Sequence, residues 1–179
     1  MIWRGGLTNT FSKTNPRLTL VKQFIDHDKI DVGLTQIFWS DYFSEKYIKP
    51  RMIIEEMLSY KYIISLEGND VASNLKWIMY SKSLVIMPIP TRESWFLESC
   101  LIPWVHFIPI SETMGDLEEK LEWCISNDNK CQQIVENANL YVSNFLNFED
   151  EKNLSTQVIE AYCNRLTFTL GNIFSNLPA

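Results

Sequence analysis

The chain contains three short apolar runs, each followed by a turn or a helical pattern. They read YIISL at residues 62–66, SLVIMPI at 83–89 and WVHFIPI at 104–110. Apolar runs of this length that include β-branched residues are typical of buried strands. Strands that alternate with helices predict βαβ units, and these form a mainly parallel sheet with helices on both faces. We therefore expect an α/β, Rossmann-like fold.

The remaining segments extend the alternation. MIWR at 1–4 predicts a short extended segment, GGLTNTFSKT at 5–14 a loop, and KIDVGLTQIF at 29–38 a strand. Helices are predicted for residues 15–25, 50–61, from Val71 onward, 93–102, 116–125 and 134–146. Asn15 is the expected cap of the first helix, with Pro16 at its first position. The acidic segment NFEDEK is expected to break the chain before a last helix, from about Ser155 to Phe168.

Composition limits the class of protein. With 179 residues and 46% hydrophobic content the chain can bury a core without disulfides or metals. A net charge of −6 argues against nucleic-acid binding, which needs clustered Lys and Arg. Four cysteines without a CxxC pair, and only two histidines, do not form a zinc framework, so we expect reduced, packing cysteines.

The sequence also carries no targeting signal. No apolar run approaches the roughly 18 residues of a membrane-spanning helix, and the N-terminus lacks the apolar region of a signal peptide. We expect a cytoplasmic location, with a peripheral position at the inner membrane as an alternative.

The segment EGND follows the first of the three apolar runs and leads into the helical pattern that starts at Val71. In an open parallel sheet, ligands bind beyond the carboxyl ends of the strands, and a helix N-terminus favours an anion. Gly68 would allow a tight turn or a close approach to a ligand, and Asn69 or Asp70 would cap the helix. These features suit a phosphate or diphosphate, although they are equally ordinary turn and cap chemistry.

Several longer blocks resemble one family. They are WRGG, NPRL, YKYIISLEGNDVASNLKW, SKSLVIMPIP, ESWFLESCLIPWVHFIPI, DLEEKLEWC and IVENANLYV, in this order from Trp3 to about Val142. They resemble the C-terminal part of the capsule-associated and lipopolysaccharide-modifying glycosyltransferases, family 90, which are related to the protein O-glucosyltransferases. The wording GNDVASNLKW is similar to the bacterial branch.

The resemblance implies the C-terminal, donor-binding lobe of a two-lobed GT-B glycosyltransferase, a hexosyltransferase that uses a UDP-sugar. Residues 1–148 would form this lobe, and 149–179 a C-terminal helix and tail that pack on it. The residues expected to bind the donor are Arg4, Gly5, Arg17, Gly68, Asn69, Asp70, Val71, Ala72, Ser73, Lys76 and Glu98. Eukaryotic members have an arginine where this chain has Leu75, and Lys76 would supply that charge.

Two functions from different classes follow. The first is transfer of a sugar from a UDP-sugar to a lipopolysaccharide or capsule glycan. The second is a truncated nucleotide-sugar binding or interaction module without transfer activity. In the family the acceptor lobe and the catalytic carboxylate precede the WRG block, so the catalytic residue is unknown here. We expect a fragment or one piece of a split enzyme, which would pair with a missing N-terminal lobe or self-associate. A plain α/β domain that binds another phosphate ligand is a third possibility.

Four further features have two interpretations each. Glu98 would bind ribose or sugar hydroxyls, or is a solvated helix residue. His106 lies in an apolar strand pattern, which favours a hydrogen-bonded core histidine over a catalytic one. The tryptophans at 3, 77, 95 and 104 are expected in the core or a lobe interface rather than stacked on a base. Asp70 alone is weak grounds for a metal site, and no obligatory metal or cofactor is expected.

Overall fold

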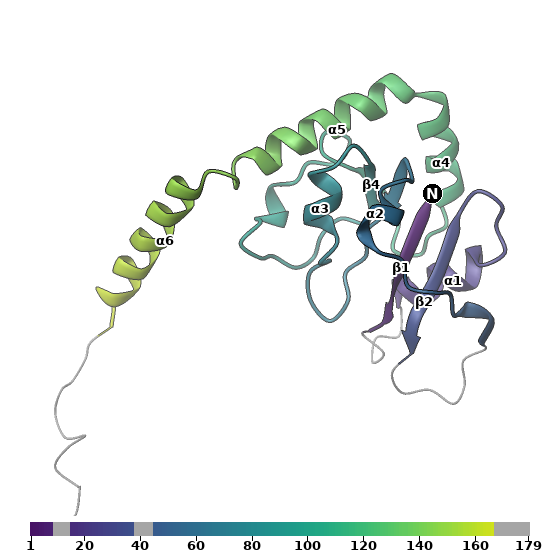
Figure 1. Ribbon diagram of the computed structural model, residues 1–179, viewed down its shortest axis with the longest axis horizontal. Helices are drawn as coiled ribbons and strands as arrows, with labels where there is room; N and C mark the ends of the chain where they lie inside the picture. The colour runs from purple at the N-terminus through teal and green to yellow at the C-terminus, as the bar shows by residue number, and fades with distance from the viewer. Residues whose placement is uncertain (9–14, 38–44, 167–179) are drawn as a thin grey trace, which may run out of the picture. The chain divides into compact units, whose positions relative to one another are not determined.

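The computed structural model describes residues 1–8, 15–37 and 45–166. Within them, five parallel strands form one sheet in the order β2-β1-β3-β4-β5 (Figure 1). The strands are β1 (Ile2–Leu7), β2 (Asp31–Ile37), β3 (Tyr62–Ile64), β4 (Leu84–Met87) and β5 (Ile108–Pro109). The α/β class and the parallel sheet predicted from the apolar runs are confirmed.

The helices lie between and after the strands. They are α1 (Pro16–Phe24), η1 (Glu45–Tyr47), α2 (Ile54–Met57), α3 (Leu75–Met79), η2 (Glu98–Cys100), α4 (Leu117–Ser126), α5 (Asp128–Ser143) and α6 (Phe148–Cys163), where η marks a 3₁₀ turn. The first helix begins as predicted, because the Asn15 side chain accepts hydrogen bonds from the backbone N–H groups of Arg17 and Leu18.

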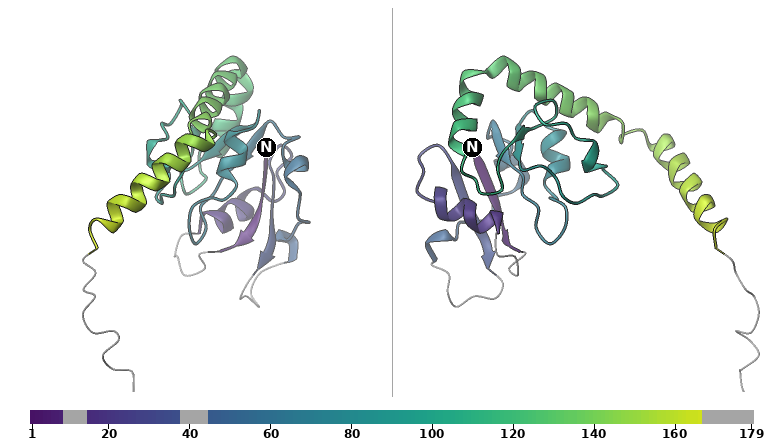
Figure 2. Two further views of the ribbon diagram at one scale, coloured as in Figure 1. Left: turned by 60° about the vertical axis from the view of Figure 1, so that its left-hand side comes forward. Right: turned by 180° about the vertical axis from the view of Figure 1, so that it is seen from behind.

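Both faces of the sheet are buried. Successive strand residues point to opposite faces, so Ile64 and Ile86 contribute to one core and Ile63 and Val85 to the other, all at most 1% exposed. The first core is shared with buried residues of α1 and α4. On the other face, α3 packs against β4 and α5 (Figure 2). This two-sided burial explains why the strands appear in the sequence as continuous apolar runs.

Several boundaries differ from the predictions. Gly5 and Leu7 belong to β1 rather than to a loop, because they pair with Leu34 and Ile37 of β2. The helices predicted for residues 50–61 and 93–102 are limited to α2 and η2. The strand predicted for 104–110 is limited to β5, since the backbone N–H of Trp104 donates to the Phe107 carbonyl at 2.8 Å and closes a turn before it.

The last helix begins earlier than predicted. NFEDEK does not break the chain, because Asn147 caps α6 through hydrogen bonds from the N–H groups of Glu149 and Asp150. Three acidic residues in the first turn also suit the positive end of the helix dipole. The predicted end at Phe168 lies outside the described residues.

The chain divides into two compact units, Met1–Ser143 and Asn144–Ala179. The first contains the whole sheet, and the second contains α6. The expected packing of residues 149–179 on the lobe stays a prediction. In the described parts of the chain, no helix combines the length and the apolar character needed to cross a membrane.

All four cysteines are free thiols. Cys124 and Cys131 are buried as expected of packing residues, and burial raises the pKa of both thiols. Cys100 and Cys163 are exposed, so the prediction of packing cysteines holds for only two of the four.

Candidate functional site

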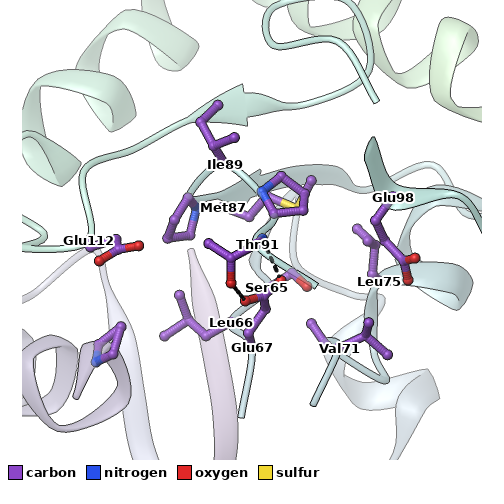
Figure 3. A pocket seen from close by; sticks show the side chains of 14 residues that line it. Ser65, Leu66, Glu67, Val71, Leu75, Met87, Ile89, Thr91, Glu98 and Glu112 are labelled. Carbon is purple, nitrogen blue, oxygen red and sulfur yellow. Dashed lines mark hydrogen bonds between the residues drawn. The ribbon is translucent and has the colours of Figure 1, made fainter. Parts of the chain in front are cut away.

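A pocket opens at the carboxyl ends of β3 and β4 (Figure 3). It encloses about 470 Å³, including its mouth toward solvent. Its lining consists of Pro16, Ser65, Leu66, Glu67, Val71, Ala72, Leu75, Met87, Pro88, Ile89, Pro90, Thr91, Glu98 and Glu112. The wall is mostly apolar, with three carboxylates and no Lys or Arg among these residues. Such a wall suits a ring with hydroxyl groups better than it suits an anion.

The position of the pocket follows from the strand order. From β1 the chain adds β2 on one side of the sheet and then β3, β4 and β5 on the other side, so the strand order switches between β1 and β3. Ligands in sheets of this kind bind near such a switch point, beyond the carboxyl ends of the strands. Pro16 enters the pocket from the segment after β1, Ser65 from the segment after β3, and Glu112 from the segment after β5. The loop after β3 thus borders a hollow beyond the carboxyl ends of the strands, and its predicted role in phosphate binding stays a prediction.

Arg17 bridges the two strands at the switch point. Its guanidinium donates to the Gly6 carbonyl at 2.9 Å, the Leu66 carbonyl at 2.9 Å and the Glu67 carbonyl at 3.1 Å. Burial disfavours the charged form and lowers the pKa of Arg17. The three acceptors are neutral carbonyls, so the positive charge is hydrogen-bonded without being cancelled by a carboxylate in these contacts.

Gly68 lies directly against this arginine. A Cβ atom at position 68 would stand 2.5 Å from Thr8 Oγ1 and 2.8 Å from Arg17 Nη2. The backbone of Gly68 is not in the left-handed region, so the glycine is required for space rather than for an unusual φ. Gly68 therefore allows the loop backbone to pack closely against the buried guanidinium of Arg17.

The predicted helix start at Val71 is wrong. The chain from Gly68 turns irregularly, and α3 begins only at Leu75. Asn74 holds this segment to the end of β3, since it accepts a hydrogen bond from Ser65 Oγ at 2.9 Å and donates to the Ile64 carbonyl. A helix of five residues supplies little dipole, so anion binding here would depend on loop N–H groups and side chains.

The predicted caps are also wrong. Asp70 accepts a hydrogen bond from the N–H of Val71 within the loop, and Asn74 rather than Asn69 or Asp70 occupies the position before α3. Asn69, Asp70 and Ser73 are all exposed at the surface of the loop. Their predicted role in donor binding stays a prediction, and the structure puts them beside Val71 and Ala72 of the pocket wall.

Glu98 is buried, so its interpretation as a solvated helix residue is wrong. The residue is 2% exposed, and its carboxylate accepts hydrogen bonds from Lys76 Nζ at 2.6 Å and from the N–H and hydroxyl of Ser94. Burial by itself would raise the pKa of Glu98, but the Lys76 and Ser94 bonds outweigh it and lower the pKa. Leu97, with a left-handed φ of 54°, turns the backbone just before Glu98. Lys76 is therefore engaged with a carboxylate at the pocket rather than projecting to water.

The sequence reasoning missed the pairing of Glu67 with Thr91. Thr91 donates its N–H to Glu67 Oε1 at 2.9 Å and its hydroxyl to Oε2 at 2.5 Å (Figure 3). The N–H of Arg92 also donates to Oε1, at 3.0 Å. These contacts join the loop after β3 to the loop after β4. The only local signal was the turn-rich segment PIPT, which gives no indication of a partner 24 residues away.

Arg4 lies apart from these residues. Its guanidinium binds both carboxylate oxygens of Asp31 at 2.8–2.9 Å, and Lys49 binds the same carboxylate. Burial would raise the pKa of Asp31, but the Lys49 and Arg4 contacts lower it below its ordinary range. Since Trp3 and Arg4 are consecutive in β1, and Arg17 lies over the Trp3 ring at 5.9 Å, Arg4 projects from the opposite face. A Cβ at Gly5 would meet the Trp3 ring at 2.7 Å, so that glycine makes room for the ring.

His106 is hydrogen-bonded as expected, but it is half-buried in the turn before β5 and is not a core residue of a strand. Its Nδ1 accepts the backbone N–H of Ile102 at 2.9 Å, and its ring lies 5.3 Å from that of Tyr141. Trp3 is buried as expected, and Trp77 is half-buried. Trp95 and Trp104 are 66% and 42% exposed, so they are not core residues, and their expected place in a lobe interface stays a prediction. No cluster of three or more metal-ligating side chains occurs in the residues described, and the expectation that no metal is required stays a prediction.

We expect His106 to make stability pH-dependent. Burial lowers its pKa in the folded chain, so the unfolded chain takes up the proton first as the pH falls below about 6.5. The stability contributed by the neutral ring is thus present above that pH and lost below it. Urea unfolding of His106→Asn between pH 8 and pH 5 should show a shallower loss of stability than the parent chain. Parallel curves for the two proteins would contradict this expectation.

Comparison with known proteins identifies relatives. The sequence model of glycosyl transferase family 90 matches residues 2–172 of the chain. It is 34% identical to O-glucosyltransferase LpsA of Dichelobacter nodosus over 162 residues, which cover 90% of this chain and 48% of that protein. It is 28% identical to Protein O-glucosyltransferase 3 of Mus musculus over 137 residues, 75% of this chain and 25% of that protein. Uncharacterized protein 027R of Frog virus 3 is 30% identical over 161 residues, which cover 75% of this chain and 16% of that protein. The chain thus spans about half the length, or less, of these relatives.

Proposed function

The chain belongs to glycosyl transferase family 90, and from this premise we propose that it forms the donor-binding part of a hexosyltransferase that uses a UDP-sugar. The observation that carries the proposal is the pocket beyond β3 and β4, which three of the predicted donor residues line, namely Val71, Ala72 and Glu98. The bacterial relative is named as an O-glucosyltransferase, which supports a hexosyl donor.

The pocket would hold the uncharged part of the donor. Its apolar wall suits the flat faces of a base or sugar ring, and carboxylates such as Glu98 and Glu112 are acceptors for hydroxyl groups. Glu112 forms no ion pair among the described residues and would repel a diphosphate, whereas the charge of Glu98 is offset by Lys76. We therefore propose that the diphosphate lies at the mouth of the pocket, over the loop from Gly68 to Ser73.

The buried charge of Arg17 would attract the diphosphate from beneath this loop. Gly68 brings the loop backbone onto the guanidinium, whose three partners are neutral carbonyls. A charge in such a position acts more strongly than one exposed to water. Exposed Ser73 and the loop N–H groups would add direct hydrogen bonds.

The acceptor proposed from the family resemblance is a lipopolysaccharide or capsule glycan. A general base that deprotonates an acceptor hydroxyl is required for transfer. We propose that the base and the acceptor site come from a lobe outside this chain's matched region, because the bacterial relative is about twice as long as that region. Self-association is the alternative source of a partner surface.

Calorimetric titration with UDP, GDP and ADP tests the donor site. We expect UDP to bind at least tenfold more tightly than the other two. Ser73→Ala should weaken UDP binding by about three- to tenfold, the effect of losing about 1 kcal/mol of hydrogen bonding. The matched control is Ser126→Ala, an exposed serine at the end of α4, which should bind UDP like the parent chain. Absence of nucleotide binding by a folded chain would overturn the proposal. If the chain binds UDP but transfers no sugar under conditions in which a full-length relative is active, the result favours a nucleotide-sugar binding module without transfer activity.

A further inference from the structure

Two tryptophans form a platform on the first unit, distinct from the donor pocket. The rings of Trp104 and Trp123 stand 4.8 Å apart at an angle of 72°, so the edge of one meets the face of the other. A hollow beside them is lined by Trp104, Trp123, Lys130, Gln133, Ile134 and Asn137, which we call the tryptophan platform. Trp104 precedes β5, at the end of the sheet opposite to the donor pocket.

Trp104 adopts a backbone conformation that is unusual for a bulky residue. Its φ is 65°, and the residue is 42% exposed, so burial offsets the strain only in part. The turn that holds it is closed by its own N–H, which donates to the Phe107 carbonyl. A strained backbone that presents an exposed indole is a feature typical of ligand-contacting surfaces.

Cationic and amide groups surround the two indoles. Lys130 Nζ lies 5.8 Å from the Trp123 ring and forms no ion pair with any of the described residues. Lys120 Nζ lies 5.4 Å from the Trp104 ring, with Asp116 and Glu119 oxygens at 3.9 and 3.7 Å, so its charge is partly compensated. The ammonium group of Lys130 is therefore available to form an ion pair with an anionic ligand.

The amides stand on α5, next to the rings. Gln133 and Asn137 are one turn apart, with Gln133 Nε2 3.4 Å from Asn137 Oδ1, a long contact that a ligand hydroxyl could replace. Each amide offers both donors and an acceptor, which is the combination that hydroxyl groups require.

We propose that the tryptophan platform binds an anionic saccharide. A sugar ring would lie on the exposed face of Trp104, its hydroxyls would bind Gln133 and Asn137, and its carboxylate or phosphate would bind Lys130. Other anions with a flat face could also stack on an indole, and the choice of a saccharide rests on the proposed function. Single-stranded nucleic acid also stacks on aromatic rings, but its backbone requires a row of cations, and of the two lysines beside the indoles Lys120 is already paired with carboxylates. The platform would hold a glycan chain at a distance from the donor pocket.

Titration with sugars in the absence of nucleotide tests the platform. Trigalacturonic acid carries carboxylates, mannose 6-phosphate carries a phosphate, and maltotriose is neutral. At least one of the two anionic sugars should bind tenfold more tightly than maltotriose, and the one that binds identifies the anionic group. Lys130→Gln should weaken that binding at least fivefold, whereas Lys82→Gln, another exposed lysine of this unit, should not.

Trp104→Gly separates binding from packing. Glycine adopts a φ of 65° without strain, which offsets part of the packing lost with the Trp123 contact, so the variant should lose sugar binding and stay folded. UDP affinity should be unchanged, which distinguishes this proposal from the proposed donor site. The proposal is overturned by a clear fall in unfolding temperature with sugar affinity retained, by equal sugar binding in all variants, or by tighter binding of a thymidine hexanucleotide than of any sugar.

Discussion

Replacement of Arg17 by methionine is expected to lower the free energy of unfolding by about 4 kcal/mol, since each hydrogen bond from a charged donor contributes about 1.5–3 kcal/mol. The change leaves the carbonyls of Gly6, Leu66 and Glu67 without this donor at the junction of β1 and β3. It also removes the surface on which Gly68 rests. Urea unfolding measures the loss.

Matched variants of the same helix separate this effect from a general sensitivity of α1. Lys22→Met removes an exposed cation of α1 and should change stability by less than about 0.5 kcal/mol. Arg17→Lys retains the charge but not the planar fork that reaches three carbonyls, so it should recover only part of the loss. An Arg17→Met chain as stable as Lys22→Met would show that the bridge contributes nothing.

The second large effect is expected from Lys76→Met, at about 3 kcal/mol, because removal of one partner leaves a buried charge uncompensated. Glu98 is 2% exposed and would keep only the Ser94 bonds. The matched control is Lys61→Met, which breaks the exposed pair of Lys61 with Asp128 and should cost less than about 1 kcal/mol. Equal losses for the two variants would contradict this ranking.

The pH dependence of the Lys76 effect follows from the sign of the Glu98 shift. In the parent chain the pKa of Glu98 is lowered, so the stability that it contributes is present above the ordinary carboxyl pKa and is lost as the pH falls through the lowered value. Without Lys76 the carboxyl can take up a proton and relieve the buried charge. The stability difference between the parent and Lys76→Met should therefore shrink from pH 7 to pH 4.

The sheet could be predicted because its strands are buried on both faces. Ile63 and Ile64 are neighbours that point in opposite directions, and both are fully buried, so the strand appears as an unbroken apolar run. The helix predicted from Val71 shows the limit of periodicity. Ala72 is a buried residue of the loop and Leu75 is a buried residue of α3. The spacing of apolar residues alone does not show which of them lies in a helix.

The site was harder to predict because its contacts are distant in sequence. Glu67 meets Thr91 across 24 residues, and Arg4 meets Asp31 across 27. The family resemblance implied that both Arg4 and Arg17 lie near the donor, but alternation along β1 places Arg4 on the face opposite to Arg17. The loop after β3 could be placed beyond the carboxyl end of a strand from the sequence, and its predicted role in phosphate binding stays a prediction. The position of Arg17 beneath Gly68 required the folded chain.

Amide hydrogen exchange of the chain with and without saturating UDP tests the central claim, that the donor binds beyond the carboxyl ends of β3 and β4. We expect slower exchange in residues 65–73 and 89–92, which border the pocket, and no change around Arg4 and Asp31. Slowing that is confined to another surface, such as the hollow of residues 26–29 and 118–125 between α1 and α4, would contradict the account.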